Sequence, residues 1–225
     1  MVRKGIVVMA VAAILVASHA SAVVYTGALS TAGGTLTGTG DWASGPTSFT
    51  YSVNDQATPG FWHYEYTLTV PSSVDDAGIE RLIIGLTIGM PFNGLMNVNG
   101  NLVSVGQMTN TGVDSNMPQS MFAGLFTVSG DTRSVTISFD SMHNPVWGNF
   151  FALGAGQNSI WNAGFTEFSV DPQRPVDDPT VHGYILRPNG EPCPPFIIPE
   201  PMTMLTLGLA GVALSRTLRN RLHRA

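Results

Sequence analysis

Two glutamates and three histidines of this sequence have the side-chain types that acid–base or metal chemistry needs. Glu65 and Glu167 lie in segments with strand-like patterns, so a fold could place them on opposite sides of a cleft. Carboxylates paired in that way hydrolyse glycosidic bonds. His63, His143 and His182 could bind a metal only if the fold brought them together, and satisfied or surface histidines are the other interpretation. The spacing of the two glutamates does not require a catalytic site, and the spacing of the three histidines does not require a metal site.

Aspartates beside turn residues are the candidates for holding a hard cation. Calcium prefers several carboxylate and carbonyl oxygens, but none of these aspartates has the Asp-x-Asp-x-Asp-Gly spacing of a calcium loop. The sequence also has no Gly-x-Ser-x-Gly elbow, no His-Glu-x-x-His pair and no phosphate loop with a lysine. We therefore expect no enzymatic activity and no cofactor, with Ca²⁺ as the alternative. The aspartates concerned are Asp75, Asp76, Asp171, Asp177 and Asp178.

Tryptophans could bind sugars by stacking their rings on sugar rings. The candidates for such a platform are Trp42, Trp62, Trp147 and Trp161. The alternative is that most of them fill the core, because large aromatic side chains dominate the cores of domains without disulfides. Cys193 is the only cysteine, so an internal disulfide is excluded. Its thiol is either an unpaired group in a linker or a point of intermolecular attachment.

The charge of the chain limits its partners. The net charge is −5, and residues 23–198 contain no lysine. An acidic body of this kind does not bind nucleic acid through charge. We expect no nucleic-acid partner.

Hydrophobic patterns predict β-strands along the whole body. Residues 62–70 alternate with period two, which predicts a strand with one buried and one wet face. Residues 81–90 are more continuously apolar, which predicts a central strand. Residues 121–128 and 134–139 predict a hairpin that turns at residues 129–131. Further strands are expected over residues 150–153, 160–170 and 181–186.

These strands, separated by turn residues and without an amphipathic helix, predict an all-β fold. We expect a single β-sandwich of jelly-roll or immunoglobulin-like kind over residues 23–186. No internal repeat indicates a solenoid or a propeller. Prolines become frequent beyond this point, so residues 187–198 are expected to form an extended Pro-rich linker, or stalk.

The N-terminus has the parts of a secretory signal. Arg3 and Lys4 precede an apolar stretch over residues 5–17, and small residues follow it. Ala20 and Ala22 form an Ala-x-Ala site, so residues 1–22 are expected to be a signal helix that is cut after Ala22. The alternative is a permanent N-terminal anchor, which the shortness of the apolar stretch disfavours.

The C-terminus combines an extended peptide, an apolar run and a basic end. Pro199 and Pro201 bracket Glu200, and prolines do not lie inside helices, so this tripeptide is expected to be extended and accessible to a protease. The apolar run after it predicts a membrane-spanning helix over about residues 202–218, because arginine side chains can extend a short apolar segment. Arginines stay on the cytoplasmic side of a membrane. The basic cluster is Arg216, Arg219, Arg221 and Arg224.

In this order, at the end of a chain with an export signal, the three parts resemble the PEP-CTERM sorting signal of Gram-negative bacteria. The resemblance covers residues 199–225, and it departs from the usual pattern only in that the arginines are separated by other residues. It implies recognition by an exosortase, an integral-membrane cysteine protease, and removal of the tail. The alternative is a plain membrane anchor that is never processed.

The resemblance implies where the protein is located, but it says little about any chemistry that the protein performs. Proteins with this signal tend to occur with exopolysaccharide systems. We therefore expect a non-enzymatic exported protein of the cell surface or extracellular matrix, associated with exopolysaccharide or biofilm. Its implied partners are an exosortase, an exopolysaccharide and, before processing, the inner membrane. A carbohydrate-binding module and a secreted hydrolase are the alternatives.

Overall fold

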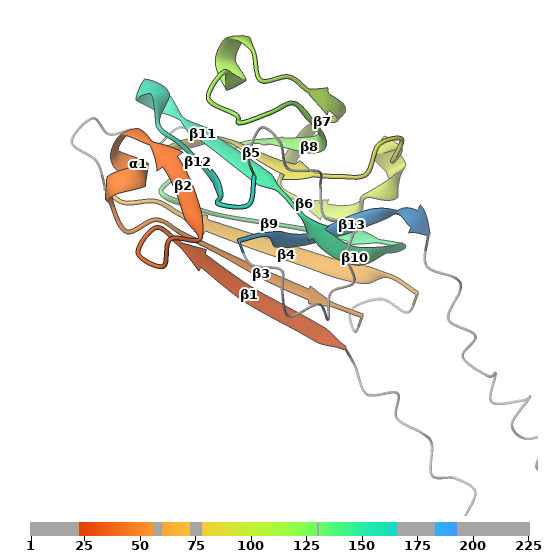
Figure 1. Cartoon of the computed structure of the whole chain (residues 1–225). Helices are drawn as coiled ribbons and strands as arrows, with labels where there is room; N and C mark the ends of the chain where they lie inside the picture. Colours follow the sequence, from red (N-terminus) through yellow and green to blue (C-terminus); the bar gives the residue numbers. More distant parts are fainter. Residues whose placement is uncertain (1–22, 56–59, 73–77, 130, 166–182, 193–225) are drawn as a thin grey trace, which may run out of the picture. The chain divides into compact units, whose positions relative to one another are not determined.

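The computed structural model describes residues 23–55, 60–72, 78–129, 131–165 and 183–192 (Figure 1). They belong to one compact unit, Ala22–Pro194. This part of the chain is all-β, as the sequence predicted, and every strand pair in it is antiparallel. Its helical elements are short: α1 (Gly40–Ser44) and the 3-10 turns η1 (Phe92–Gly94), η2 (Gly112–Asp114) and η3 (Ala155–Gln157).

The first sheet has five strands in the order β1-β3-β4-β9-β6. Buried and more exposed residues alternate along β4, which confirms the strand predicted from period-two patterning. Residues pair one to one across β1, β3, β4 and β9, without a register shift. The five strands are β1 (Val24–Ser30), β3 (Ser48–Asn54), β4 (Trp62–Thr69), β9 (Ser134–Ser141) and β6 (Met96–Asn99).

The second sheet has six strands in the order β2-β12-β11-β5-β8-β7. The predicted central strand is confirmed as β5, which lies between β11 and β8, although it begins at Ile79 and ends at Gly85. β11 is buried at every position. The six strands are β2 (Leu36–Thr39), β12 (Ser159–Asn162), β11 (Phe150–Gly154), β5 (Ile79–Gly85), β8 (Met121–Thr127) and β7 (Asn101–Met108).

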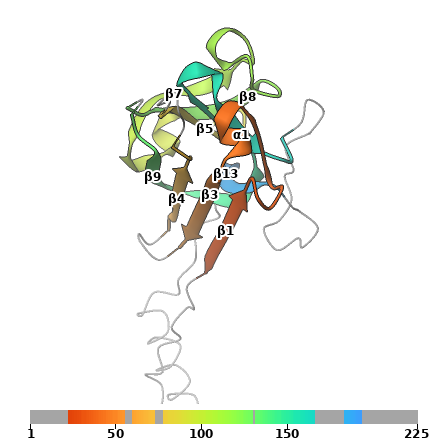
Figure 2. The same ribbon diagram turned by 90° about the vertical axis from the view of Figure 1, so that its left-hand side faces the viewer.

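The two large sheets face each other across a shared apolar core (Figure 1). Turned by 90°, the molecule shows β1, β3 and β4 side by side in the lower layer (Figure 2). Aromatic rings join the layers: the ring centroids of Phe49 on β3 and Phe150 on β11 lie 4.0 Å apart, and those of Phe126 on β8 and Phe139 on β9 lie 6.2 Å apart. Such ring pairs each add about 0.5–1.5 kcal/mol to the effect of area burial.

The predicted hairpin is wrong in its pairing, although both of its strands exist. β8 pairs with β5 and β7 in the six-stranded sheet, whereas β9 pairs with β4 and β6 in the five-stranded sheet. The turn after β8 therefore carries the chain from one sheet to the other. Periodicity shows which face of a strand is buried, but it does not show which strand lies beside it.

A third, two-stranded sheet corrects the predicted boundary of the linker. β10 (His143–Gly148) pairs with β13 (Ile185–Pro192), so residues 187–192 form a strand and not an extended stalk. Among the strands that the structure describes, β13 pairs only with β10, and such an edge position tolerates proline because no second ladder needs the missing N–H. The hydroxyl of Tyr66 on β4 donates to the carbonyl of Leu186 at 2.8 Å, which ties β13 to the core.

Arg187 on β13 is fully buried, which the sequence did not predict. Its guanidinium donates to Thr87 Oγ1 and to the carbonyl of Pro188, both at 2.8 Å. A Cβ at Gly148 would overlap the Arg187 side chain, so the glycine provides the space. Burial lowers the pKa of Arg187 to about 10, against the opposing effect of the nearby tyrosines Tyr66 and Tyr64.

Candidate binding surface on the five-stranded sheet

The outward face of the five-stranded sheet is covered mainly by small hydroxyl side chains. The one-to-one register aligns outward residues of β1, β3, β4 and β9 in rows, such as Ala28–Thr50–Thr67–Thr136. The neighbouring rows are Thr26–Ser52–Glu65–Ser138 and Ser30–Ser48–Thr69–Ser134. We call these three rows the hydroxyl face. They contain one carboxylate, Glu65, and no basic residue.

The hydroxyl face is divided by its own hydrogen bonds. On the side of β9, Thr67 and Thr136 share a hydrogen bond of 2.8 Å, and Thr69 and Ser134 share one of 3.0 Å. On the side of β1, no side-chain hydrogen bond joins Thr26, Thr50 or Ser52 to another residue that the structure describes. The second group of hydroxyls can therefore bond to a ligand without breaking a bond within the protein.

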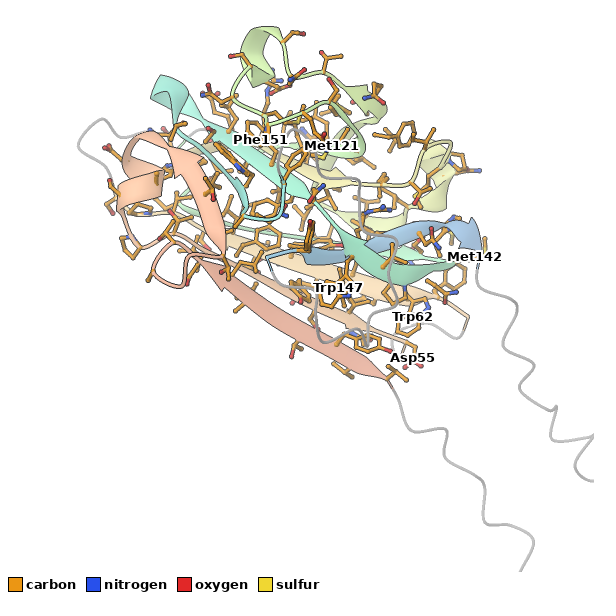
Figure 3. The ribbon with its side chains drawn as sticks, in the orientation of Figure 1. Asp55, Trp62, Met121, Met142, Trp147 and Phe151 are labelled. Carbon is orange, nitrogen blue, oxygen red and sulfur yellow. The ribbon has the colours of Figure 1, made fainter. Side chains whose placement is uncertain are left out.

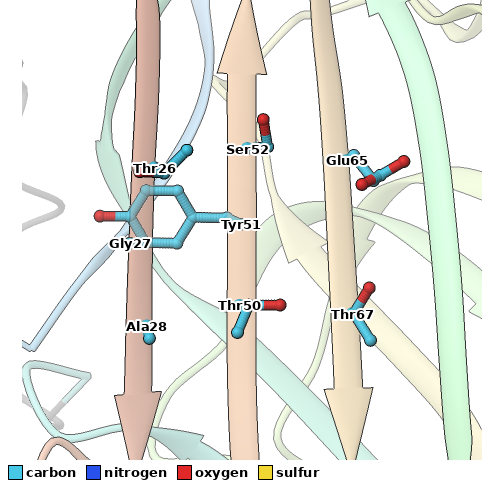
Figure 4. Close-up of a pocket in the computed structure, with 8 residues that line it drawn as sticks. All are labelled: Thr26, Gly27, Ala28, Thr50, Tyr51, Ser52, Glu65 and Thr67. Atoms are coloured by element: carbon cyan, nitrogen blue, oxygen red, sulfur yellow. The ribbon is translucent and has the colours of Figure 1, made fainter.

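An open depression of about 440 Å³ lies over this second group (Figure 4). β4 contributes Glu65, which is exposed. Tyr51 belongs to the core side of β3, and its ring lies across β1 at Gly27. A Cβ at Gly27 would overlap that ring, so the glycine permits the position of Tyr51. The depression offers hydroxyl donors and acceptors and one negative charge. It suits a neutral, hydroxyl-rich ligand better than an anion. Its lining residues are Thr26, Gly27, Ala28, Thr50, Tyr51, Ser52, Glu65 and Thr67.

The next row of the sheet holds an interaction that sequence analysis missed. His63 Nδ1 and Asp140 Oδ1 lie 2.7 Å apart, and the side-chain amide of Asn97 donates to Asp140 Oδ2 at 2.6 Å. Asp140 is buried, and Asn97 has a φ of 50° at the register shift of β6. Period-two patterning could have placed Asp140 on the outward face of its strand. Only the register between β4 and β9 brings it to His63.

A histidine–aspartate pair can activate a nucleophile, provided that a hydroxyl or thiol lies on the other ring nitrogen. In the described ranges, His63 Nε2 makes no hydrogen bond to such a group. His143 is buried on β10, and its Nδ1 makes no hydrogen bond to any group that the structure describes. His182 and Glu167 lie outside the described residues, so the glutamate pair and the three-histidine site stay untested predictions.

The tryptophans do not form one exposed platform. Trp42 and Trp62 are 0% and 6% exposed, so neither can stack on a sugar at the surface, and the prediction is wrong for these two. Trp62 stacks on Tyr25 instead. Trp147 and Trp161 are half-buried on β10 and β12, in two different sheets. The burial of Trp42 and Trp62 is explained by the demand of the core for large apolar side chains.

No family model, curated protein or solved structure matches this chain. In the part of the chain that the structure describes, no three histidine, cysteine, aspartate or glutamate residues are grouped so that they could hold a metal ion. The described ranges likewise contain no helix of the length and apolar character that crossing a membrane requires.

Several predicted sites lie outside the described residues. They are the signal cleavage site (Ala20, Ala22), the tripeptide (Pro199, Glu200, Pro201), the basic cluster (Arg216, Arg219, Arg221, Arg224), Cys193 and the aspartates proposed for Ca²⁺ (Asp75, Asp76, Asp171, Asp177, Asp178).

Proposed function

We propose that this chain is an exported, non-enzymatic protein of the cell surface or extracellular matrix, and that an exosortase cuts its C-terminal signal. One observation supports the proposal: sequence segments that resemble an export signal and a sorting signal lie on either side of a β-rich body. The first is the Ala-x-Ala site that ends at Ala22. The second is Pro199-Glu200-Pro201 with its apolar run and arginines. This arrangement fits a protein whose role depends on where it is displayed.

The finer architecture is part of this proposal. Two sheets that share one core fit a β-sandwich with jelly-roll or immunoglobulin-like connections. After β13 the chain would continue as a short Pro-rich stalk over residues 193–198, and then as a membrane helix over about residues 202–218. The inner membrane would hold the chain until the exosortase cuts it, and exopolysaccharide would be its neighbour afterwards.

Intact-mass analysis of the protein recovered from exosortase-containing cells and their medium tests the proposal. We expect an N-terminus at Val23 and loss of the residues from about Pro199 onward. Glu200→Gln should leave the tail on the chain, whereas Glu191→Gln, a matched change upstream of the signal, should not. A wild-type mass that still includes Arg216–Ala225 would overturn sorting and make the tail a plain anchor.

Carbohydrate binding is a second candidate function, and the depression on the hydroxyl face favours it. Free hydroxyls beside one carboxylate can bond to the hydroxyl groups of a neutral polysaccharide. Calorimetric titration with the exopolysaccharide of the source organism tests this. Thr50→Val should weaken binding at least about tenfold, the equivalent of about 1.4 kcal/mol. Thr69→Val, in the internally bonded part of the face, should leave binding unchanged. Absence of heat with the wild-type chain would reject this candidate.

A further inference from the structure

The two large sheets have four outer edges, and three of them carry features that prevent pairing with another strand. β2 and β6 are only four residues long, and β6 has a register shift between Met96 and Asn99. β7 has a register shift between Leu102 and Ser104. Short edges and bulges are the usual protections of a sheet. β1 has neither: it has seven residues, a regular register, no charge and no proline.

Hydrogen bonds at the two ends of β1 show which of its residues face the open side. The Asp55 N–H donates to the Val23 carbonyl, and the Thr31 N–H donates to the Thr47 carbonyl. In a regular antiparallel ladder, alternate residues bond to the same neighbour. Odd-numbered residues from 23 to 31 therefore bond towards β3. The backbone groups of Val24, Thr26, Ala28 and Ser30 point away from it.

Ser30 is already satisfied on the open side. Its N–H donates to Thr35 Oγ1 at 2.8 Å, and its carbonyl accepts from the Thr35 N–H at 3.1 Å. In the described part of the chain, Val24, Thr26 and Ala28 have no partner for these edge groups. Val24, an apolar residue, is also 51% exposed. The unprotected edge is therefore three alternate residues long and is centred on Thr26.

We propose that this edge pairs antiparallel with β1 of a second copy of the chain, about a two-fold axis at Thr26. Thr26 then faces Thr26 of the partner subunit, and Val24 faces Ala28 of the partner subunit. Each of these facing pairs exchanges two backbone hydrogen bonds. Any other two-fold register leaves a backbone group of these three residues unused. The occupant is a second copy because the bonding pattern is symmetric about Thr26 and because β1 itself carries no charge that would repel an identical strand.

The contact also has consequences for side chains. Val24 packs against a methyl side chain, and two threonines meet across the axis, an arrangement that stabilises antiparallel pairs. The hydroxyl faces of the two copies become one continuous surface, because they lie on the same side of the joined sheet. A two-fold contact of this kind closes at the dimer and does not propagate into a filament. It requires neither tail processing nor carbohydrate binding.

Site-specific cross-linking of the full-length chain tests the register. In a Cys193→Ser background, Thr26→Cys should be joined into dimers by a short bismaleimide, because paired Cα atoms in a hydrogen-bonded position lie about 5.5 Å apart. Thr50→Cys is the matched control: it is exposed on the same face, but it lies one strand away from the edge. Absence of cross-linking at Thr26→Cys, or equal cross-linking at both positions, would overturn the register.

Sedimentation velocity of the full-length chain in detergent tests the contact without a cross-linker. Thr26→Lys places like charges opposite each other, as natural edge strands do to prevent pairing. We expect it to lower the association constant at least about tenfold. Thr50→Lys should leave that constant unchanged, and far-ultraviolet circular dichroism should show that both variants are folded. A monomeric wild-type chain, or association that Thr26→Lys leaves intact, would refute the proposal.

Discussion

The outward faces of the two large sheets differ in what covers them. The five-stranded sheet presents the hydroxyl face, which no described segment covers with an apolar cluster. The six-stranded sheet presents Ile83, Phe151 and Leu153, and a second apolar cluster covers them with Met117 and Phe165. Met121 and Phe151 lie on this upper side, beneath the segment that links β7 to β8 (Figure 3). One sheet thus has a single buried face, and the other has two.

This difference explains the patterns in the sequence. Strands with one buried face alternate, as β4 does, whereas strands with two buried faces are apolar throughout, as β11 is. A face without an apolar cover is free to bind a partner, so the comparison also locates the candidate site. Four experiments could break or sharpen the comparison.

Phe151→Ala should have the largest effect, because it removes a fully buried ring from the covered face. We expect the free energy of unfolding to fall by about 3–5 kcal/mol. Thr136→Ala, which is exposed on the hydroxyl face, is the control and should change it by less than about 1 kcal/mol. Urea unfolding followed by circular dichroism measures both. Equal losses would show that the two faces do not differ energetically.

Met117→Ala tests the cover itself. Met117 is 2% exposed and packs in the cluster above the six-stranded sheet. Its loss should cost about 2 kcal/mol, the low end for buried methionine, because a surface segment can collapse into the space. Ser115→Ala, an exposed change in the same segment, is the control. If thermal unfolding of the two variants were indistinguishable, the segment would not be a structural cover.

Thr67→Val and Thr136→Val together test the internal bond of the hydroxyl face. A double-mutant cycle in urea should give a coupling of about 0.2–1 kcal/mol, as expected for a cross-strand hydroxyl pair. Thr67→Val with Thr50→Val is the control cycle. These two residues are neighbours across β3 and β4, but the structure shows no hydrogen bond between them, and their coupling should be smaller.

Asp114→Asn should give the smallest effect, visible only as a change with pH. Asp114 lies in η2 on the segment that covers the six-stranded sheet, 3.4 Å from the Arg81 guanidinium on β5. Burial raises the pKa of Asp114, although Arg81 opposes the shift. A raised pKa favours the protonated carboxyl in the folded state. The contribution to stability is therefore present below the ordinary aspartate pKa and is lost as the pH rises through the raised value.

The free energy of unfolding, measured from acidic to neutral pH, checks this direction. The wild-type chain should lose stability relative to Asp114→Asn as the pH rises. Asp131→Asn, at an exposed aspartate, should follow the wild-type profile. A wild-type chain that gains stability relative to Asp114→Asn over the same range would contradict the assigned cause.

Features that depend on neighbouring residues could be predicted from the sequence, whereas features that depend on contacts between residues far apart in the chain could not. Local periodicity predicted β4 and the central place of β5 correctly. It failed for β8 and β9, because pairing partners are chosen by contacts far apart in sequence. It also failed for residues 187–192, where two prolines suggested a linker. Arg187 is buried because Gly148 leaves space for it, and no local pattern carries that information.

The candidate site shows the same limit. Serine and threonine at alternate positions could be read from β3 and β4, but the rows of the hydroxyl face exist only in the observed register. The unprotected edge of β1 could not be predicted from the sequence either, because its three open residues are identified only by the hydrogen bonds at both ends of the strand. The tryptophans led to a wrong prediction at two positions because a ring that is large enough to stack on a sugar is equally suited to fill the core.

The space beside Arg187 has an evolutionary consequence. A side chain at position 148 and an arginine at position 187 exclude each other sterically, so neither position can drift freely. Among descendants of this fold, a residue larger than glycine at 148 should appear only where 187 has become short. The two positions, which lie on β10 and β13, should therefore change together, and their covariation would mark sequences that have inherited this two-stranded sheet.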